Sequence, residues 1–173
     1  VANVLDAQAH GAQIRVRTRV TGATRDEGLW RVALATADGT ASEVTARAIV
    51  NAAGPWVKQV LDTMRPAREG EGSVRHVKGS HIVVPRVHAE KHAYILQNAD
   101  NRIVFVIPYQ ENYSLIGTTD VPVERYDEPA ISEDEIAYLL KLANAYLDKP
   151  LTRADVVWTF SGVRPLYDDG SSD

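Results

Sequence analysis

Short apolar segments separated by tight-turn sequences are the feature that most restricts how this chain can fold. Residues 29–36 (LWRVALAT) and 42–50 (SEVTARAIV) flank ADGT, whose Asp38-Gly39 pair is a strong signal for a hairpin turn. Further along, AYILQ, RIVFVIPY and YSLIGTTD are separated only by NADNR and QEN, which are typical of turns. We therefore expect an α+β fold, a largely antiparallel sheet with helices packed against it.

Two other stretches of the first third extend this pattern. In residues 13–22 (QIRVRTRVTG), Ile14, Val16, Thr18 and Val20 alternate with arginines, which predicts a strand with one apolar face. Residues 48–56 (AIVNAAGPW) pass from an apolar strand into small residues, and Pro55 suits the first turn of a helix. The apolar stripe of that helix is formed by Trp56, Val57, Val60 and Leu61.

The rest of the chain predicts a loop, a strand, a helix and a last strand. Residues 65–73 (RPAREGEGS) are typical of a surface loop, and residues 80–85 (SHIVVP) of a strand. Ser132 and Glu135 form a capping-box sequence, so we expect a helix from there to about Leu147. Its inner face consists of Ile136, Leu139, Leu140, Ala143 and Leu147. Residues 154–166 (ADVVWTFSGVRPL) predict the last strand.

Composition excludes several classes of function. The chain has 173 residues, 45% of them hydrophobic, which suits one domain or part of a larger one. A net charge of -4 argues against a nucleic-acid partner. The absence of cysteine excludes disulfides, thiolate metal sites and a cysteine nucleophile, and it fits a cytosolic protein. No run is long enough to span a membrane, and the N-terminus does not resemble a signal peptide.

The two ends indicate how the chain relates to a whole protein. It begins with Val1 rather than methionine, and it stops in the polar run YDDGSSD just after an apolar strand. We expect an internal piece of a longer protein. The alternative is a processed but complete domain.

The stretch KGSHIVVPR places Lys78, Gly79, Ser80 and His81 directly before a buried strand. Histidine is the side chain best suited to accept a proton near neutral pH, so His81 is a candidate base. The alternative is a structural histidine that is hydrogen-bonded at a strand end. The other histidines lack metal-ligand spacing and are interpreted as surface residues, and no metal site is expected. They are His10, His76, His88 and His92.

Three other segments place polar or small residues after apolar strands. IGTTD offers two hydroxyls and a carboxylate to a ligand, or else a strand cap and turn. In SGVRPL, Arg164 can clamp a phosphate or carboxylate, or it can pair with an aspartate such as Asp168 or Asp169. NAAGPW allows close approach to its backbone, or it forms a tight strand-to-helix turn. No G-x-G-x-x-G loop is present, so the chain would supply only part of a dinucleotide site.

Together and in this order, the motifs resemble the flavin-dependent glycerol-3-phosphate dehydrogenases of the bacterial respiratory chain. The blocks that carry the resemblance are IVNAAGPWVKQVLD, VKGSHIVVPRVH, AYILQNADNRIVFVIPY, LIGTTDV and VVWTFSGVRPL. The resemblance implies an FAD-binding domain interleaved with a substrate domain built on an antiparallel sheet. Residues 1–56 would be the back half of the FAD-binding domain. Residues 57–173 would be most of the substrate domain, truncated at its C-terminal end.

The resemblance also implies a chemistry, the oxidation of sn-glycerol 3-phosphate to dihydroxyacetone phosphate with hydride passing to FAD and electrons to quinone. His81 would be the base or would orient the hydroxyl, Arg164 would hold phosphate, and Thr118 would contact the substrate. Lys78 and Tyr109 would line the pocket. Ala52, Ala53, Gly54 and the backbone near Val20 would contact FAD. The family is peripheral to the inner face of the cytoplasmic membrane and often dimeric.

Two alternatives to this function stay open. One is a related FAD-dependent oxidase of amines or amino acids, in which Arg164 would bind a carboxylate. The other is a non-catalytic binding domain that keeps the sheet without the chemistry. Because the glycine-rich loop is missing, we expect the isolated chain to have negligible activity and weak or no FAD binding.

Overall fold

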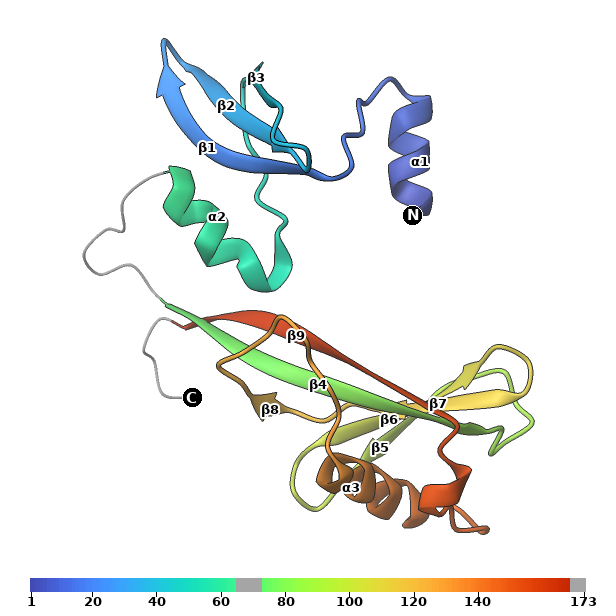
Figure 1. Ribbon diagram of the computed structural model, residues 1–173. Helices are drawn as coiled ribbons and strands as arrows, with labels where there is room; N and C mark the ends of the chain where they lie inside the picture. The colour runs from blue at the N-terminus through green and yellow to red at the C-terminus, as the bar shows by residue number, and fades with distance from the viewer. Residues whose placement is uncertain (65–72, 169–173) are drawn as a thin grey trace. The chain divides into compact units, whose positions relative to one another are not determined.

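The computed structural model describes residues 1–64 and 73–168. The chain divides into two compact units, Val1–Glu71 and Gly72–Asp173, and each is described by itself (Figure 1). The predicted surface loop over 65–73 lies outside the described residues, except for Ser73. The border between the units falls later than the expected domain boundary after Trp56, because the helix that follows this residue packs against the first unit's sheet. The assignment of an FAD-binding and a substrate domain remains a prediction.

The first unit contains a three-stranded antiparallel meander, β1 (Thr18–Asp26), β2 (Leu29–Thr36) and β3 (Ala41–Ala46). Helix α1 (Ala2–Ala9) precedes it, and the 3₁₀ turn η1 (Gly54–Trp56) leads into helix α2 (Val57–Met64). The predicted hairpin turn is present, since Gly39 has a φ of +88° and the Asp38 carboxylate accepts hydrogen bonds from Thr36 and Thr40.

Two predicted strand segments of this unit are not strands. Residues 13–17 precede β1, because Arg17 adopts a left-handed conformation with a φ of +52° and breaks the extended run. Residues 47–50 follow the end of β3. Ala46 already pairs with Trp30, so β2, which begins at Leu29, has almost no residues left to pair with them.

The first unit has a small core. Ala23, Val32 and Leu34 are buried, and Val20, Trp30, Val44, Ile49 and Met64 pack against them. Helix α2 contacts β1, yet none of its residues is buried within the described chain. Of the apolar stripe predicted on this helix, Val57, Val60 and Leu61 are half-buried and Trp56 is 41% exposed.

The second unit is built on one antiparallel sheet, as predicted. Its strands are β4 (Ser73–Pro85), β5 (Tyr94–Gln97), β6 (Ile103–Tyr109), β7 (Tyr113–Gly117), β8 (Val121–Pro122) and β9 (Trp158–Asp168). The hydrogen-bonded order is β5-β6-β7-β4-β8, and β9 also pairs with β4. Strand β4 thus contacts β7, β8 and β9, and it organises the sheet.

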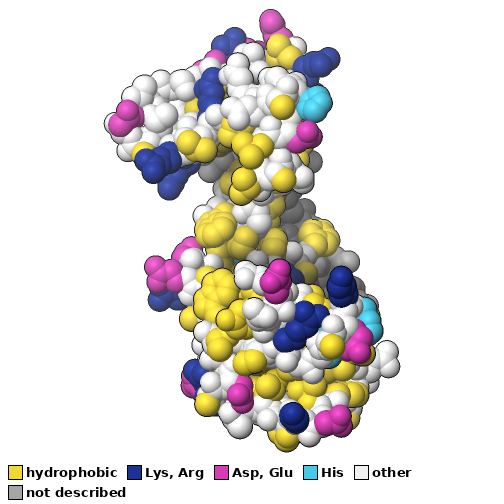
Figure 2. All heavy atoms as spheres, turned by 90° about the vertical axis from the view of Figure 1, so that its right-hand side faces the viewer, with side chains coloured by type: hydrophobic (Ala, Val, Ile, Leu, Met, Phe, Trp, Pro, Cys, Tyr) yellow, Lys and Arg dark blue, Asp and Glu magenta, His cyan; other side chains and the backbone are white. Residues whose placement is uncertain are grey.

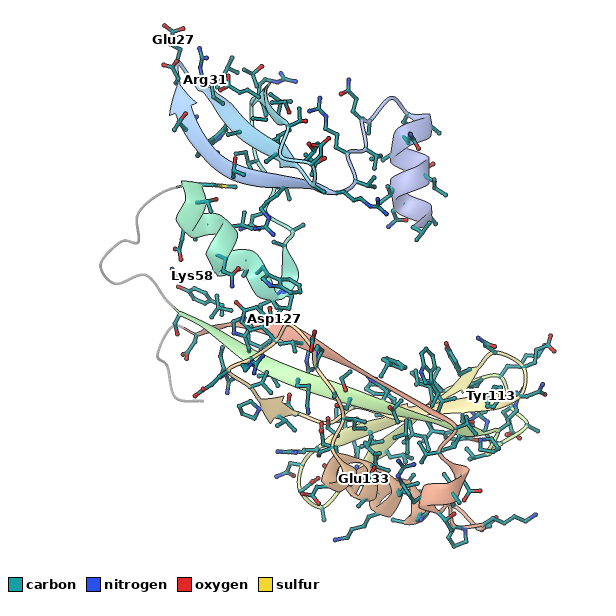
Figure 3. All side chains as sticks on the ribbon, viewed as in Figure 1. Glu27, Arg31, Lys58, Tyr113, Asp127 and Glu133 are labelled. Carbon is teal, nitrogen blue, oxygen red and sulfur yellow. The ribbon has the colours of Figure 1, made fainter. Side chains whose placement is uncertain are left out.

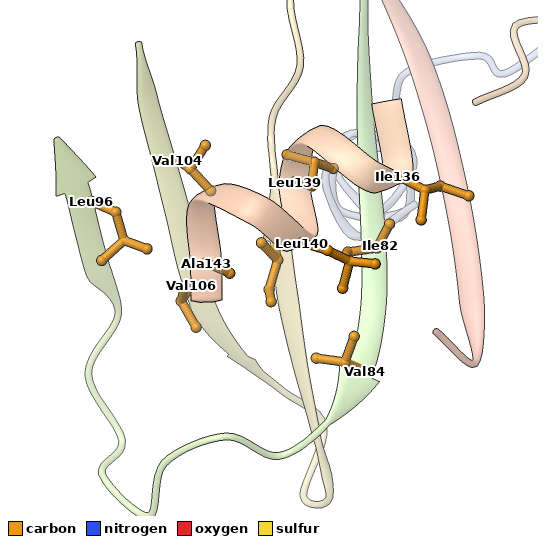
Figure 4. Packing of buried hydrophobic residues seen from close by; sticks show 10 residues of the cluster. Ile82, Val84, Leu96, Val104, Val106, Ile136, Leu139, Leu140 and Ala143 are labelled. Carbon is orange, nitrogen blue, oxygen red and sulfur yellow. The ribbon is translucent and has the colours of Figure 1, made fainter. Parts of the chain in front are cut away.

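Helix α3 (Glu133–Asn144) covers one face of this sheet (Figure 4). The predicted capping box between Ser132 and Glu135 is present. The helix ends three residues before Leu147, where the Asn144 amide exchanges two hydrogen bonds with the backbone of Leu151 and reverses the chain. The core between helix and sheet consists of Ile82, Val84, Leu96, Val104, Val106, Ile116, Ile136, Leu139, Leu140 and Ala143.

The opposite face of the sheet carries no helix among the described residues of this unit (Figure 1). We call it the open face and define it by the paired row Phe105, Gly117, His81 and Phe160. Phe105 and Phe160 are each more than a third exposed, and Trp158, two residues before Phe160, is 58% exposed. Figure 2 shows hydrophobic and charged side chains next to one another on the viewed face of this unit.

Candidate functional site

Side chains alternate between the two faces of the sheet along β4, so the residues of KGSH lie on two different faces. Lys78 and Ser80 point to α3, where both contact the Glu135 carboxylate. Gly79 and His81 belong to the open face, because successive strand residues face opposite sides. The candidate site on the open face therefore contains His81 and excludes Lys78.

The His81 ring is held between a glycine and an aromatic ring. A Cβ on Gly117 would lie less than 3.0 Å from three atoms of the His81 ring, so only glycine leaves the ring room to lie over the backbone. On the β9 side, the ring stacks on Phe160 with centroids 4.9 Å apart and 8° between the planes. The imidazole is thus confined to one orientation on the open face.

The electrostatics of His81 favour its neutral form. Burial lowers the pKa of the ring, and the nearby positive charge of Arg164 lowers it further. Its Nδ1 is buried and has no hydrogen-bond partner among the described residues. A neutral imidazole with a lone pair is what a general base requires at neutral pH.

Thr118 and Arg164 both lie close to Gly79, which precedes His81 by two residues on β4. A Cβ on Gly79 would lie 2.5 Å from Thr118 Oγ1 and 3.5 Å from Arg164 Nη2. Gly79 therefore makes space for a hydroxyl from the end of β7 and a guanidinium from β9. Together with His81, these side chains bring an imidazole, a hydroxyl and a cation to one part of the open face.

Arg164 is also half of an ion pair, which was the alternative interpretation of its position. Its Nη2 donates to Asp120 Oδ1 at 2.6 Å, so the partner is Asp120 rather than the predicted Asp168 or Asp169; Asp169 lies outside the described residues. Both side chains are about half exposed. Within the described chain, no hydrogen bond engages Nε or Nη1 of Arg164. An incoming anion can reach this part of the guanidinium.

Lys78 and Tyr109 are not brought to this cluster. Lys78 Nζ donates to Glu135 Oε2 at 2.8 Å and to the Ala130 carbonyl at 2.6 Å, and its side chain is only 12% exposed on the α3 face. Tyr109 shares the open face with Phe105 but lies four residues further along β6. At about 3.3 Å per residue, it is on the order of 13 Å from the row that contains His81.

A buried polar network lies on the α3 side, directly behind the cluster. Glu135 Oε1 accepts hydrogen bonds from Ser80 Oγ at 2.8 Å and from Thr119 Oγ1 at 2.7 Å, and Oε2 pairs with Lys78. Burial alone would raise the pKa of the Glu135 carboxyl, but hydrogen bonds from Lys78, Ser132, Thr119 and Ser80 lower it to about 2. Sequence reasoning found Glu135 only as a helix cap and missed this second set of contacts.

In the first unit, residues 51–54 fit the approach of a flat ligand. Asn51 holds the turn, since its Nδ2 donates to the Val57 carbonyl at 2.8 Å and its Oδ1 accepts from the Ala53 backbone at 3.3 Å. Ala52 and Gly54 are exposed, and Gly54 has a φ of +55° that favours glycine. Residues 52–54 thus carry no side chain larger than a methyl group, which suits the close approach of a flavin nucleotide.

Val20 contributes differently to the first unit. Its side chain packs against the buried cluster, and the register of β1 against β2 shifts between Val20 and Gly22. The half-buried Val20 side chain thus packs toward the core, and the predicted ligand contact at this position is with the backbone.

His88 is not the surface residue that its polar neighbours suggested. Its side chain is 11% exposed, and both ring nitrogens are buried without a hydrogen-bond partner among the described residues. The ring packs edge-on against Tyr94 with centroids 4.8 Å apart. No group of three or more histidine, aspartate or glutamate side chains in the described chain could hold a metal ion. None of its helices is long and apolar enough to cross a membrane.

A family model described as FAD dependent oxidoreductase matches residues 1–172. The chain belongs to this family. The predicted resemblance to flavin-dependent glycerol-3-phosphate dehydrogenases is confirmed by similarity to the aerobic glycerol-3-phosphate dehydrogenase of Escherichia coli K12. The two sequences are 50% identical over 173 residues, which is 99% of this chain and 34% of the relative.

The chain is also similar to two further proteins of known name. It is 45% identical over 170 residues to D-erythritol 1-phosphate dehydrogenase of Brucella abortus, covering 97% of this chain and 34% of the relative. The structure of glycerol-3-phosphate dehydrogenase from Bacillus halodurans complexed with FAD matches with a TM-score of 0.78 at 29% identity. That match covers 96% of this chain and 34% of that structure. The chain thus spans about a third of the length of these relatives.

Proposed function

We propose that this chain is part of a longer flavoenzyme, here called the parent protein, that oxidises sn-glycerol 3-phosphate to dihydroxyacetone phosphate. The observation that carries the proposal is the convergence of His81, Thr118 and Arg164 on one part of the open face, above two glycines that make room for them. The 50% identity to a glycerol-3-phosphate dehydrogenase supports the substrate class.

Each of the three side chains suits one task in this reaction. Arg164 binds the phosphate through the N–H groups that Asp120 leaves free. Thr118 orients a hydroxyl of the substrate. Neutral His81 accepts the proton of the C2 hydroxyl through a ring nitrogen as the carbonyl forms. The bound FAD supplies the acceptor for the hydride that leaves C2.

The contact between Arg164 and Asp120 sets a condition on substrate binding. The phosphate must either share the guanidinium with the carboxylate or displace it, because two anions beside one cation repel each other. Since both side chains are about half exposed, the ion pair contributes only about 0–1 kcal/mol and is easily displaced.

D-erythritol 1-phosphate is a second candidate substrate. The relative named for it is 45% identical to this chain, close to the 50% of the glycerol-3-phosphate dehydrogenase. Both substrates have a terminal phosphate next to a secondary alcohol, which the same arginine, hydroxyl and base can bind. An amine or amino-acid oxidase has weaker support, since glycine oxidase from Bacillus cereus is only 22% identical and shares the fold.

Further contacts and partners belong to the proposal for the parent protein. Ala52, Ala53, Gly54 and the Val20 backbone contact FAD, and quinone accepts the electrons. The parent protein acts at the inner face of the cytoplasmic membrane and is a homodimer. Lys78 and Tyr109 are not part of the proposed substrate pocket, because Lys78 is buried behind the sheet and Tyr109 is remote from His81. The isolated chain is inactive and binds FAD weakly or not at all.

Anaerobic reduction of the parent protein's flavin tests the substrate. The absorbance of oxidised flavin is followed after mixing with sn-glycerol 3-phosphate, D-erythritol 1-phosphate, glycerol or glycine. We expect one of the two polyol phosphates to bleach the flavin fastest and glycerol to bleach it at least 100-fold more slowly, because glycerol offers Arg164 no phosphate. Fast reduction by glycine and none by either phosphate would overturn the proposal in favour of an amino-acid oxidase.

A further inference from the structure

Three hydroxyls on the α3 side of the sheet, those of Ser80 and Thr119 buried and that of Ser161 half-buried, lie directly next in sequence to three residues of the open face. Ser80 precedes His81, Thr119 follows Thr118, and Ser161 follows Phe160. Ser80 and Ser161 lie within strands, where neighbouring residues point to opposite faces. Thr118 and Thr119 follow the end of β7 and also point apart, since Thr118 Oγ1 lies near Gly79 and Thr119 Oγ1 binds Glu135. Fixing each hydroxyl therefore also restricts the direction of its neighbour.

All three hydroxyls are connected to Glu135. The Glu135 carboxylate accepts hydrogen bonds from Ser80 and Thr119, and Ser80 Oγ lies 2.9 Å from Ser161 Oγ. Two further contacts hold the chain between β7 and β8 against β4: the Ser80 backbone N–H donates to Thr119 Oγ1 at 2.9 Å, and the Thr119 backbone N–H donates to the Ser80 carbonyl at 3.3 Å. The network therefore joins three separate segments of the sheet.

The network is buried and charged, which makes it stiff. Ser80 is fully buried, Thr119 is 2% exposed and Glu135 is 7% exposed. Lys78 neutralises the carboxylate at 2.8 Å, so the buried charge has a partner. Hydrogen bonds to a charged group in such surroundings are stronger than those between neutral groups. A helix cap alone would need only the Ser132 contacts, yet Glu135 also binds Lys78 and two strand hydroxyls.

We propose that Glu135, with Lys78 and the hydroxyls of Ser80, Thr119 and Ser161, is a positioning network that fixes His81 and Thr118 on the opposite face. This inference rests on the proposed function, since it assigns the reaction to that face. None of the network residues touches the substrate. They act by holding the strand positions from which the base and the orienting hydroxyl project, and Lys78 gains a role behind the site.

Thr119 offers a matched pair of variants in the parent protein. Thr119→Val keeps the shape and removes the hydroxyl that joins Ser80 to Glu135, whereas Thr119→Ser keeps the hydroxyl. Because the network holds the base and not Arg164, Thr119→Val should lower kcat about 10-fold or more and leave KM for sn-glycerol 3-phosphate within about 2-fold. Thr119→Ser should recover most of the lost kcat.

Glu135→Gln tests the charge of the network, and Glu133→Gln is its control. Glu133 lies in the same first turn of α3 and is 73% exposed in an ion pair with Arg153 (Figure 3). We expect Glu135→Gln to lower kcat like Thr119→Val and Glu133→Gln to leave it unchanged, at equal FAD content. Equal losses in Thr119→Val and Thr119→Ser, or a change confined to KM, would overturn the positioning role.

An NMR titration of His81 in the wild type and the same variants separates this inference from the proposed function. The His81 ring signal and its midpoint pH should shift in Thr119→Val and Glu135→Gln and stay in place in Thr119→Ser and Glu133→Gln. If no polyol phosphate reduces the wild-type flavin, the proposed function fails. The titration alone then tests whether the network positions His81. A His81 signal that is the same in all variants would overturn the network whatever the substrate is.

Discussion

The ring of His81 lies parallel to the ring of Phe160, with 4.9 Å between their centroids and 8° between their planes. The ring also lies against Gly117, where a side chain would collide with it. The stacking partner comes from β9 and the glycine from β7, so the sheet pairing itself sets the orientation of the imidazole. The proposed base is thus part of a rigid surface rather than of a loop.

Gly117→Ala should therefore disable the site without unfolding the sheet. Its Cβ would come within 3.0 Å of the His81 ring and force the ring away from Phe160. We expect flavin reduction in the parent protein to slow by about 100-fold, and the unfolding free energy to fall by about 1–3 kcal/mol. The control is Gly162→Ala in β9, where an added Cβ meets nothing within 4 Å. Equal rates of flavin reduction in Gly117→Ala and Gly162→Ala would contradict this prediction, since the His81 ring would then have room to avoid the added Cβ.

The pH dependence of the parent protein should report on His81. A base acts when it is neutral, so the rate should fall as pH decreases through the pKa of His81, which lies below its ordinary value of 6.5. Arg164→Gln should move that pKa upward, because a positive charge is removed. It should still remain below 6.5, since burial is the larger cause and is unchanged. An NMR titration of the His81 ring measures its pKa in the wild type and in Arg164→Gln. A wild-type pKa above 6.5 would contradict the proposal that His81 is neutral when it acts as the base.

Arg164 and Asp120 should affect substrate affinity in opposite directions. Arg164→Met should raise KM for the phosphate substrate about 10- to 150-fold, because a charge-assisted hydrogen bond is worth about 1.5–3 kcal/mol. Asp120→Asn should lower KM by up to about 5-fold, since the competing ion pair is exposed and weak. Steady-state kinetics of the parent protein check both. A higher KM in Asp120→Asn would mean that Asp120 holds the arginine in its binding position.

Glu135 should make the second unit sensitive to acid. Its folded pKa of about 2 lies below the usual 4.5, so its contribution to stability is fully present above pH 4.5 and is lost as pH falls toward 2. This contribution to the unfolding free energy is roughly 3 kcal/mol, because each unit by which the folded pKa is lowered corresponds to about 1.4 kcal/mol. Urea unfolding at several pH values between 5 and 2.5 should show a steeper loss of stability in the wild type than in Glu135→Gln. Parallel curves would contradict the lowered pKa.

Local turn and capping signals predicted much of the fold. The Asp38-Gly39 turn, the strands of the second unit and the Ser132 capping box depend on residues close in sequence, and all are present. The last strand begins at Trp158 and not at residue 154, because Arg153–Asp155 form a 3₁₀ turn capped by Thr152. The failures have two causes, a left-handed backbone conformation at one residue and a contact between a helix end and the chain that follows it. Residues 13–17 end their strand pattern at the left-handed Arg17, and the helix stops where Asn144 binds the backbone of Leu151.

The sequence also predicted only part of the candidate site, because some of its contacts join residues that are far apart in the chain. Lys78 and His81 are three residues apart, and strand alternation alone puts them on opposite faces, a signal that was present in the sequence. The partner of Arg164 could not be inferred locally, since Asp120 is 44 residues away and meets it only through the sheet. The stacking of Phe160 on His81 likewise depends on the register of β9. The contacts of Glu135 with Lys78, Ser80 and Thr119 were not predicted, because its place in the capping box already accounted for this residue.

The most direct test of the account is single-turnover flavin reduction in the parent protein with and without the His81 imidazole. Oxidised enzyme is mixed anaerobically with saturating sn-glycerol 3-phosphate, and the flavin absorbance is followed for the wild type and His81→Ala at matched FAD content. We expect His81→Ala to slow the reduction by about 10²- to 10⁴-fold, while the substrate concentration at half-maximal rate changes little. Reduction of the variant at the wild-type rate would contradict the claim that His81 on the open face is the base of the reaction.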